Sequence, residues 1–174
     1  MNHGTKEEEL HQLLRRTIKD IYGIRGISLS SYDGLSIVTE CSEDEDEEEE
    51  GRRKTLNWFK RVRAKLAHKY SAGAQQITNI GLGQLRTSTV FYDDCIVVQE
   101  SCRIGREGTE EEEGEKGGSD WHPTRPVLTV VLSPDGNLGR LRETLPTLMR
   151  TLEPLTKAID ALERASDVAE NDEF

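Results

Sequence analysis

The sequence predicts an α/β domain, more strictly α+β, in which helices cover one five-stranded antiparallel sheet in the order α-β-β-α-β-β-β-α. Three observations lead to this prediction. Hydrophobic residues recur at helical spacing in three segments, and five further segments are strand-like runs. The chain has 174 residues, a length typical of a single domain. Short polar turns join four of the strand-like runs into two hairpins. A nearly continuous apolar run nearer the C-terminal end is typical of a strand buried on both faces.

The first helix is predicted at about residues 5–22. Thr5 and Glu8 have the spacing of a capping box, and apolar residues follow at spacings of three and four. A glycine ends this pattern. Two strand-like runs, 24–31 and 35–41, then flank an Asp-Gly pair, which predicts a tight β-hairpin.

An acidic run and a basic run follow one another after this hairpin. Residues 43–50 are all Asp or Glu, which predicts a disordered, solvated loop over about 42–51. Residues 52–70 contain eight Lys or Arg and no acid, and the run has the period of an amphipathic helix that ends near 71–73. Its apolar side comprises Leu56, Phe59, Val62, Leu66, Ala67 and Tyr70. Its basic side comprises Arg53, Lys54, Lys60, Arg61, Lys65, His68 and Lys69.

A basic amphipathic helix of this kind has several possible roles. It could lie on an anionic membrane, occupy a calmodulin-like groove, touch nucleic acid or form the surface helix of a globular domain. Nucleic acid is disfavoured because Phe59 and Tyr70 fall on the apolar side, which leaves only Trp58 among the charges. The globular context of the other elements favours the surface helix.

The remaining strands come from the second half of the chain. Two β-rich runs, 85–92 and 95–102, are joined across Asp93-Asp94 and predict a second hairpin. A low-complexity acidic insert at about 103–124, predicted to be disordered, separates this hairpin from the apolar strand 126–132. The apolar strand is expected to lie in the centre of the sheet.

The last element is a long amphipathic helix at about residues 137–165. Its leucines alternate between spacings of three and four, which fits either packing on the sheet or a short coiled-coil seam. Packing on the sheet is favoured because Pro146 and Pro154 interrupt the pattern and predict a kink. Residues 1–166 are therefore expected to form one domain, followed by an acidic tail at 167–174.

Composition sets limits on cellular location. The formal net charge of −10 is concentrated in the two acidic tracts, and basic residues slightly outnumber acidic ones elsewhere. The sequence has no apolar run of membrane-spanning length, no signal-peptide pattern and no lipidation motif, since Asn2 follows Met1. We therefore expect a cytoplasmic protein that reaches a membrane only through a partner.

The sequence shows no catalytic or cofactor-binding constellation. Its four histidines are scattered without metal-ligand spacing, and Gly81-Leu82-Gly83 lacks the context of a phosphate-binding loop. No nucleophile elbow is present, and the three cysteines lack CxxC spacing, which favours buried reduced thiols. The prediction is a protein that is not an enzyme and that has no metal, no cofactor and no nucleic-acid partner.

Five segments carry a resemblance to a known family: 10–18, 23–38, 89–101, 125–141 and 151–162. Their order and motifs resemble the roadblock (dynein light chain) superfamily. Within it, they resemble most the Ragulator (LAMTOR) roadblock subunits, which scaffold MAP kinases and bind MEK. The resemblance implies a roadblock-like fold with no catalytic residues.

The resemblance also implies a site. Roadblock domains dimerise through the second helix and third strand, which joins two sheets into one. Transferred to this sequence, that mode places a partner interface on the basic helix and on the run 85–92. The implied contacts are Leu56, Phe59, Val62, Arg63 and Leu66 on the helix, and Thr87, Thr89 and Phe91 on the strand.

Membership of the Ragulator branch would imply a scaffold subunit on late endosomes or lysosomes that forms a heterodimer with another roadblock protein. Such a complex holds further Ragulator subunits, anchors Rag-type small GTPases in TOR signalling and gathers MEK and ERK. A lipidated subunit attaches it to the membrane. Two alternatives stay open: a homodimeric GTPase regulator of the bacterial MglB type or a dynein light chain, and a protein whose basic helix binds a membrane or calmodulin.

Overall fold

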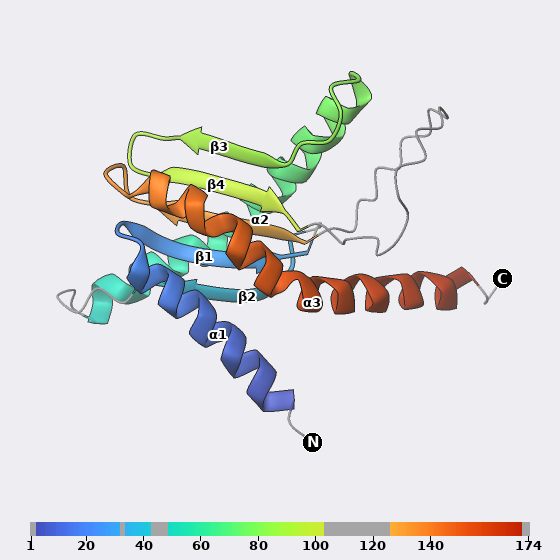
Figure 1. The fold of residues 1–174 in the computed structure, drawn as a ribbon, viewed down its shortest axis with the longest axis horizontal. Coiled ribbons are helices and arrows are strands. Elements are labelled where there is room, and N and C mark those ends of the chain that lie inside the picture. Colours follow the sequence, from blue (N-terminus) through green and yellow to red (C-terminus); the bar gives the residue numbers. More distant parts are fainter. Residues whose placement is uncertain (1–2, 32–33, 43–48, 103–125, 172–174) are drawn as a thin grey trace.

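The computed structural model describes residues 3–31, 34–42, 49–102 and 126–171, and the side chains of residues 8–31, 34–42, 57–102 and 126–158. The predicted order α-β-β-α-β-β-β-α is confirmed (Figure 1). The elements are α1 (His3–Asp20), β1 (Ile24–Ser30), β2 (Ser36–Cys41), α2 (Glu49–Asn79), β3 (Thr87–Phe91), β4 (Ile96–Ser101), β5 (Val127–Leu132) and α3 (Leu138–Asn171).

The five strands form one antiparallel sheet in the order β2-β1-β5-β4-β3, so the predicted fold class is also confirmed. Strand β5 is the central strand, as expected, and all six of its residues are buried. The two hairpins occupy opposite halves of the sheet, and β5 joins them by pairing with β1 and β4. This arrangement leaves β2 and β3 at the two edges.

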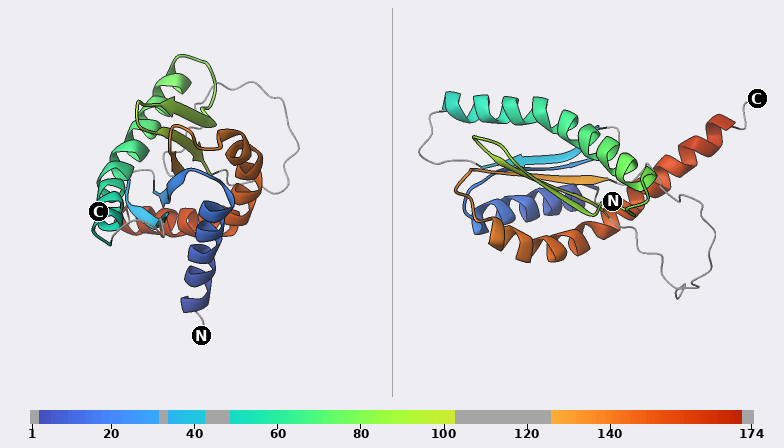
Figure 2. Two further views of the ribbon diagram at one scale, coloured as in Figure 1. Left: turned by 90° about the vertical axis from the view of Figure 1, so that its left-hand side faces the viewer. Right: turned by 90° about the horizontal axis from the view of Figure 1, so that it is seen from above.

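Helices cover both faces of the sheet (Figure 2). Helices α1 and α3 pack on one face, and α2 packs on the other. The alternation of side chains along each strand decides which residues meet which helix. In β1, for example, Ile27 and Leu29 join the cluster under α1 and α3, while Gly26 lies against Phe59 of α2.

The larger core lies between α1, α3 and the sheet. Of the leucines of α3 that repeat in the sequence, Leu141, Leu145, Leu148 and Leu152 are buried there and Leu138 and Leu155 are partly buried, so packing on the sheet explains the spacing over this part of the helix. Residues with a side-chain exposure of 1% or less in this cluster are Leu14, Ile21, Ile27, Leu29, Val98, Leu128, Val130, Leu132, Leu141 and Leu152.

The core beneath α2 is smaller. Phe59, Leu66, Cys95, Val97 and Val131 are its buried apolar members. The Phe59 ring lies so close to β1 that a Cβ atom at position 26 would be 3.0 Å from a ring carbon, so glycine is the residue that fits there. Buried polar side chains fill the remaining space, as in the 3.2 Å bond that Gln99 donates to the Thr129 hydroxyl.

A close backbone contact ties α1 and β1 to the turn between β5 and α3. Gly23 has a φ of 85°, and a Cβ at this position would lie 2.4 Å from the Cα of Gly136. The Ser133 amide donates to the Gly23 carbonyl at 2.7 Å, and the Asn137 amide donates to the Tyr22 carbonyl at 2.9 Å. The glycine that ends the first helical pattern is therefore also a packing requirement.

Helix α2 is longer than the sequence pattern predicts. It begins at Glu49, inside the predicted loop 42–51, and it continues through 71–73, where a break was expected. Tyr70, Ser71 and Ala74 are buried on either side of Gly73, and this packing outweighs the cost of about 1 kcal/mol for a helical glycine. Residues 43–48 of the acidic tract and the whole insert 103–124 lie outside the described residues.

Helix α3 is also longer than predicted. It continues to Asn171, so the first part of the predicted tail 167–174 is helical, and residues 172–174 lie outside the described part of the chain. Pro146 and Pro154 are both inside the helix. The helix changes direction along its length, as Figures 1 and 2 show, which agrees with the predicted kink.

The three cysteines are free thiols. Cys95 and Cys102 are buried, which confirms the prediction for these two, whereas Cys41 is only half-buried. Burial raises the pKa of the Cys102 thiol to about 12 and that of the Cys41 thiol to about 11. The folded protein therefore holds both thiols in their protonated form at neutral pH.

The contact between Gly23 and Gly136 predicts that Gly23→Ala lowers the free energy of unfolding by more than about 2 kcal/mol. The left-handed backbone costs a residue with a Cβ about 1–2 kcal/mol, and the clash with the opposite backbone adds to this. Chemical denaturation measures the change. Gly73→Ala is the matched control, because nothing lies within 4 Å of a Cβ there. It should raise stability by about 0.5–1 kcal/mol, and equal effects of the two substitutions would contradict the packing described.

The buried thiols predict a loss of stability at alkaline pH. Unfolded thiols titrate near the ordinary value of 9.0, whereas Cys102 in the fold titrates at about 12. Its contribution is therefore complete below pH 9.0 and lost as the pH rises toward 12. Urea denaturation between about pH 8 and about pH 11 should show a smaller fall for Cys102→Val than for the wild type. A fall of the same size in both proteins would show that this thiol does not contribute.

Candidate protein interface

Strand β3 forms an edge of the sheet, and β4 is its only strand partner in the described part of the chain. The Tyr92 amide donates to the Cys95 carbonyl at 2.8 Å, and the Ser101 amide donates to the Arg86 carbonyl at 3.4 Å. Hydrogen-bonded pairs alternate along an antiparallel ladder, so the even-numbered residues of β3 bond to β4. The residues whose main-chain N–H and C=O groups point to the open edge are Thr87, Thr89 and Phe91.

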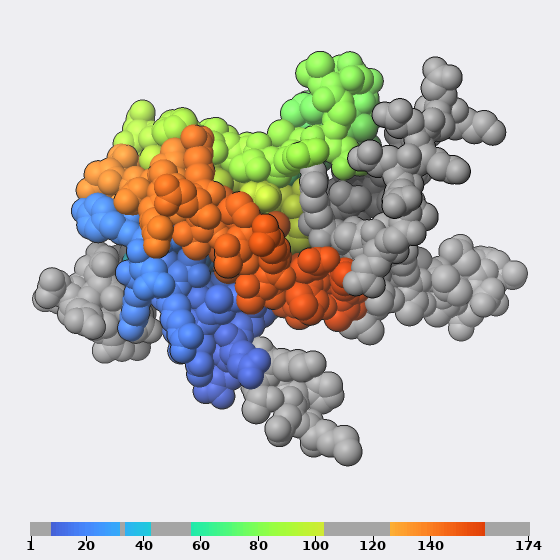
Figure 3. Space-filling view, in the orientation of Figure 1, coloured from blue at the N-terminus to red at the C-terminus, as the bar shows by residue number. Residues whose placement is uncertain are grey.

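Exposed apolar side chains gather along this edge. Among the described residues, five of the seven exposed large hydrophobic side chains lie on β3, just after it or in the connection 80–86 that precedes it. They are Ile80, Leu82, Val90, Phe91 and Tyr92. The end of α2 and this connection form the lobe, light green in Figures 1 and 3, that stands beyond β3. We call residues 80–92 the edge surface.

Helix α2 holds the edge surface in place. The Tyr70 hydroxyl donates to the carbonyl oxygens of Leu85 and Arg86, at 3.2 and 2.8 Å. Burial raises the pKa of Tyr70, which keeps this hydroxyl a donor. The Thr78 hydroxyl lies 3.3 Å from the Gly83 carbonyl and can donate to it. The route from α2 to β3 is therefore fixed by side chains of α2.

The outer face of α2 is basic. Lys60, Arg61, Lys65, His68 and Lys69 are exposed, and no ion pair with an acid is found for them among the described residues. Residues 51–79 contain no Asp or Glu. Over residues 57–79, the helix therefore presents positive charge on the sheet face opposite α1 and α3, and no acid with a described side chain pairs with it.

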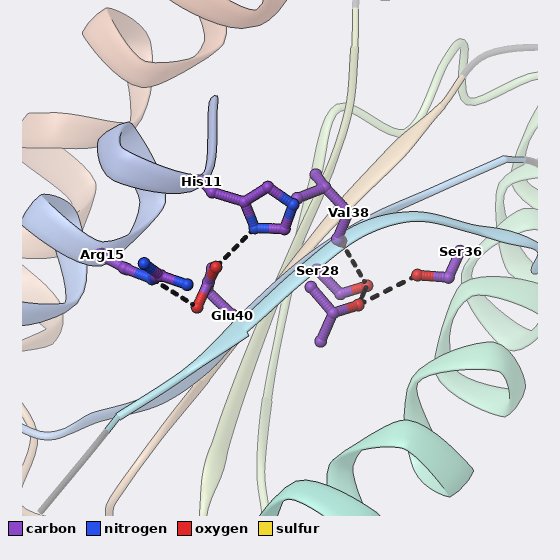
Figure 4. Close-up of polar contacts among 7 residues, drawn as sticks. His11, Arg15, Ser28, Ser36, Val38 and Glu40 are labelled. Carbon is purple, nitrogen blue, oxygen red and sulfur yellow. Dashed lines mark hydrogen bonds and ion pairs between the residues drawn. The ribbon is translucent and has the colours of Figure 1, made fainter. Parts of the chain in front are cut away.

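The other edge, β2, has a different chemistry (Figure 4). The Glu40 carboxylate is almost buried and bonds to His11 at 2.5 Å and to Arg15 at 3.1 Å. On the other side of the strand, Arg63 of α2 donates to the Thr39 hydroxyl at 2.7 Å. Inward-pointing charges of this kind commonly protect a sheet edge from pairing with another chain. Strand β3 lacks them, which makes it the better candidate for pairing.

The structure places the predicted helix contacts mainly beneath α2, and their role at a partner interface stays a prediction. Phe59 and Leu66 are 1% and 8% exposed and belong to the core beneath α2, so they are packing residues. Val62 is half-buried and packs against the same core, and half-buried Arg63 is engaged with β2. The side chain of Leu56 lies outside the described residues. The apolar stripe of α2 faces its own sheet, so it is not available to a membrane or a calmodulin-like groove.

The predicted strand contacts lie at the open edge but not beside that stripe. Thr89 and Phe91 are paired with Val98 and Ile96, whose side chains point toward α1 and α3. The side chains of Thr89 and Phe91 therefore lie on the α1 and α3 face of the sheet, whereas the apolar stripe of α2 packs on the opposite face. What makes Thr87, Thr89 and Phe91 candidates is their main chain, and their role as partner contacts stays a prediction.

Sequence reasoning missed one part of the candidate interface, the apolar pair Ile80 and Leu82. These two large apolar residues alternate with Gly81 and Gly83 just past the end of α2, and that pattern is the signal that the sequence offered.

The described residues suggest no chemical site. No three His, Cys, Asp or Glu side chains gather within them to hold a metal ion. A groove of about 950 Å³ lies between α1, β2 and α3, with apolar lining that includes Leu10, Leu13 and Leu155 and charged lining from Glu9 and Arg16. Within the described ranges, no helix combines the length and the apolar character needed to cross a membrane.

Comparisons with known proteins give a consistent picture of the fold. No family model matches the sequence, and no curated protein matches it. The structure is similar to a roadblock/LC7 domain from Streptomyces avermitilis, with a TM-score of 0.58 and 15% identity, over 83% of this chain and 95% of that one.

Two structures of MglB resemble this chain about as closely as the Streptomyces domain does. The protein from Myxococcus xanthus has a TM-score of 0.59 and 12% identity, over 88% of this chain and 92% of its own. The gliding protein MglB from Thermus thermophilus has a TM-score of 0.60 and 10% identity, over 87% and 91%. Identities this low are evidence for a shared architecture. The chain therefore has the roadblock/LC7 fold.

Proposed function

We propose that the protein is a noncatalytic scaffold subunit that pairs through its edge surface with another roadblock-domain protein. The observation that carries this proposal is the open edge of β3, which has outward main-chain groups and exposed apolar side chains. A strand in this state binds another strand readily, because each new main-chain bond satisfies a donor and an acceptor. A partner that supplies its own edge strand would extend the sheet and cover Phe91 and Tyr92.

The finer proposal places this subunit in a Ragulator-like complex. Its support is the resemblance of five sequence segments to the Ragulator roadblock subunits, together with the fold. In such a complex the protein would contact further Ragulator subunits and help to anchor Rag-type small GTPases in TOR signalling. It would also contribute to MEK and ERK scaffolding, and it would reach late endosomes or lysosomes through a lipidated partner.

A second candidate function is supported by the similarity to MglB structures from two bacteria, each over most of both chains. In this case the chain would form a homodimer and regulate a small GTPase. A dynein light chain is the related alternative within the same superfamily. The oligomeric state of the purified chain without a partner distinguishes the two candidates. A homodimer favours the regulator, whereas a monomer favours a subunit that pairs with a different roadblock protein.

The edge surface predicts that Thr89→Pro abolishes partner binding while the fold is retained. The Thr89 N–H points away from β4, so proline removes a bond to the partner strand and none within the sheet. Tagged wild-type and variant proteins can be purified from their own cells, and the bound proteins identified by mass spectrometry. We expect a roadblock-domain protein in a 1:1 ratio with the wild type, and its loss with Thr89→Pro.

Two controls make this result specific. Thr89→Val keeps the main-chain N–H and should retain the partner. Val90→Pro removes a bond to β4 and should lower stability by about 1–3 kcal/mol, the cost of leaving a carbonyl of β4 without its donor, which separates edge blocking from a loss of stability. A wild-type chain that is monomeric and captures no roadblock protein would contradict the proposed function.

The scaffold proposal also predicts that the chain alone leaves GTP hydrolysis unchanged. Purified protein is added to a Rag-type small GTPase or another candidate small GTPase, and phosphate release is followed at several protein concentrations. A rate equal to that of the GTPase alone is expected, because the described residues offer no catalytic constellation. Clear acceleration by a homodimer of this chain would favour the regulator.

A further inference from the structure

The positive charge on α2 is not distributed evenly around the helix. Contacts with the hairpin of β1 and β2 fix one side: Arg63 bonds to Thr39, and a Cβ at Gly34 would lie 2.9 Å from the Ala64 carbonyl. At 100° per residue, Lys65 and Lys69 fall on the opposite side of the helix, in one column with Arg61. Since β2 and β3 are the two edges of the sheet, this opposite side faces the β3 edge. We call Arg61, Lys65 and Lys69 the basic flank.

The geometry of sheet extension determines what meets the basic flank. Two antiparallel edges joined by a two-fold axis perpendicular to the sheet keep the same faces on the same side. The α2 helices of both partners would therefore lie on one face, each with its β3-facing side toward the other. In a pair of identical chains, two basic flanks would face one another, and residues 51–79 of α2 contain no acid to compensate them.

We infer that the basic flank selects a partner whose facing helix is acidic and rejects a second copy of this chain. The inference rests on the proposed pairing through β3 and adds the chemistry of the partner to it. Opposed like charges lower the affinity of a wrong pair, while complementary charges raise the association rate and fix the register. The edge strand β3 provides most of the binding free energy, and the basic flank determines which partner is bound.

A protein partner fits these observations better than an anionic membrane. A helix that binds in a bilayer interface inserts its apolar side, and in α2 that side is occupied by the sheet through Phe59 and Leu66. The basic flank also adjoins an open strand edge, which a bilayer cannot pair. Membrane binding by the basic flank would therefore overturn the inference.

A charge-reversed copy of the chain can stand in for the acidic partner. Lys65→Glu/Lys69→Glu reverses two charges of the flank on exposed positions. Mixed with labelled wild type, this variant should bind at least about 10-fold more tightly than wild type binds itself at low ionic strength. The difference should shrink at about 1 M salt, where the screening length falls to about 3 Å. Analytical ultracentrifugation of the full chain measures both associations.

A matched control variant carries the same change in net charge elsewhere. Arg142→Glu/Arg150→Glu reverses two exposed charges on α3, on the other sheet face. It should bind wild type no more tightly than wild type binds itself. Equal gains from both double variants would overturn the inference, because net charge alone would then explain the association. A tight, salt-independent wild-type homodimer would also overturn it.

Two further experiments separate a failure of the proposed β3 pairing from a failure of the charge-based selection. Adding Thr89→Pro to the charge-reversed variant should abolish the mixed pair. A mixed pair that survives this change would contradict the proposed pairing through β3, and with it the basis of the inference. Flotation with phosphatidylserine vesicles tests the membrane: wild-type binding that is lost in Lys65→Glu/Lys69→Glu, without any mixed pair, would assign the flank to lipid.

Discussion

An open antiparallel sheet of five strands has two edge strands whose outward main-chain N–H and C=O groups lack a partner in the sheet. The different surroundings of these two edges determine where another chain can bind. At β2, the Glu40 carboxylate bonds to His11 and Arg15, and on the α2 face of the strand Arg63 donates to the Thr39 hydroxyl. At β3, the main-chain groups of alternate residues point outward beside exposed Phe91 and Tyr92. The asymmetry of the two edges makes β3 the surface on which a partner strand is expected.

Helix α2 links this edge to the interior. Its apolar stripe is used in the core, where Phe59 packs on Gly26, and its Tyr70 hydroxyl fixes the connection that leads into β3. The same helix therefore stabilises the sheet, positions the edge and leaves its basic residues outside. Because the apolar side is occupied, any interaction of α2 with another molecule depends on its charges.

Much of the fold follows from local patterns in the sequence. The Asp-Gly turn, the apolar strand 126–132 and the leucine spacing of α3 each dictate one element, and together they require the observed order. The ends of the long helices were less predictable, because burial on the sheet carries α2 through Gly73 against its intrinsic preference. Tertiary contacts, which no local window contains, decide such boundaries.

The candidate site was predictable only in part. The strand residues Thr87, Thr89 and Phe91 lie at an edge of the sheet, as predicted, whereas Phe59 and Leu66 lie in the core beneath α2, so their role as partner contacts stays a prediction. An apolar helix stripe looks the same in sequence whether it meets its own sheet or another chain. The strand order and the register of β3 decide between these cases, and both depend on residues far apart in the sequence.

Amide hydrogen exchange tests the central claim, that the open edge of β3 is the partner site. In the chain alone, the amides of Thr87, Thr89 and Phe91 should exchange fast and those of Ser88 and Val90 slowly, since only the latter bond to β4. In the complex purified with its partner, the three outward amides should become protected. Protection that appears instead along β2, or in the groove between α1 and α3, with these three amides unchanged, would contradict the account.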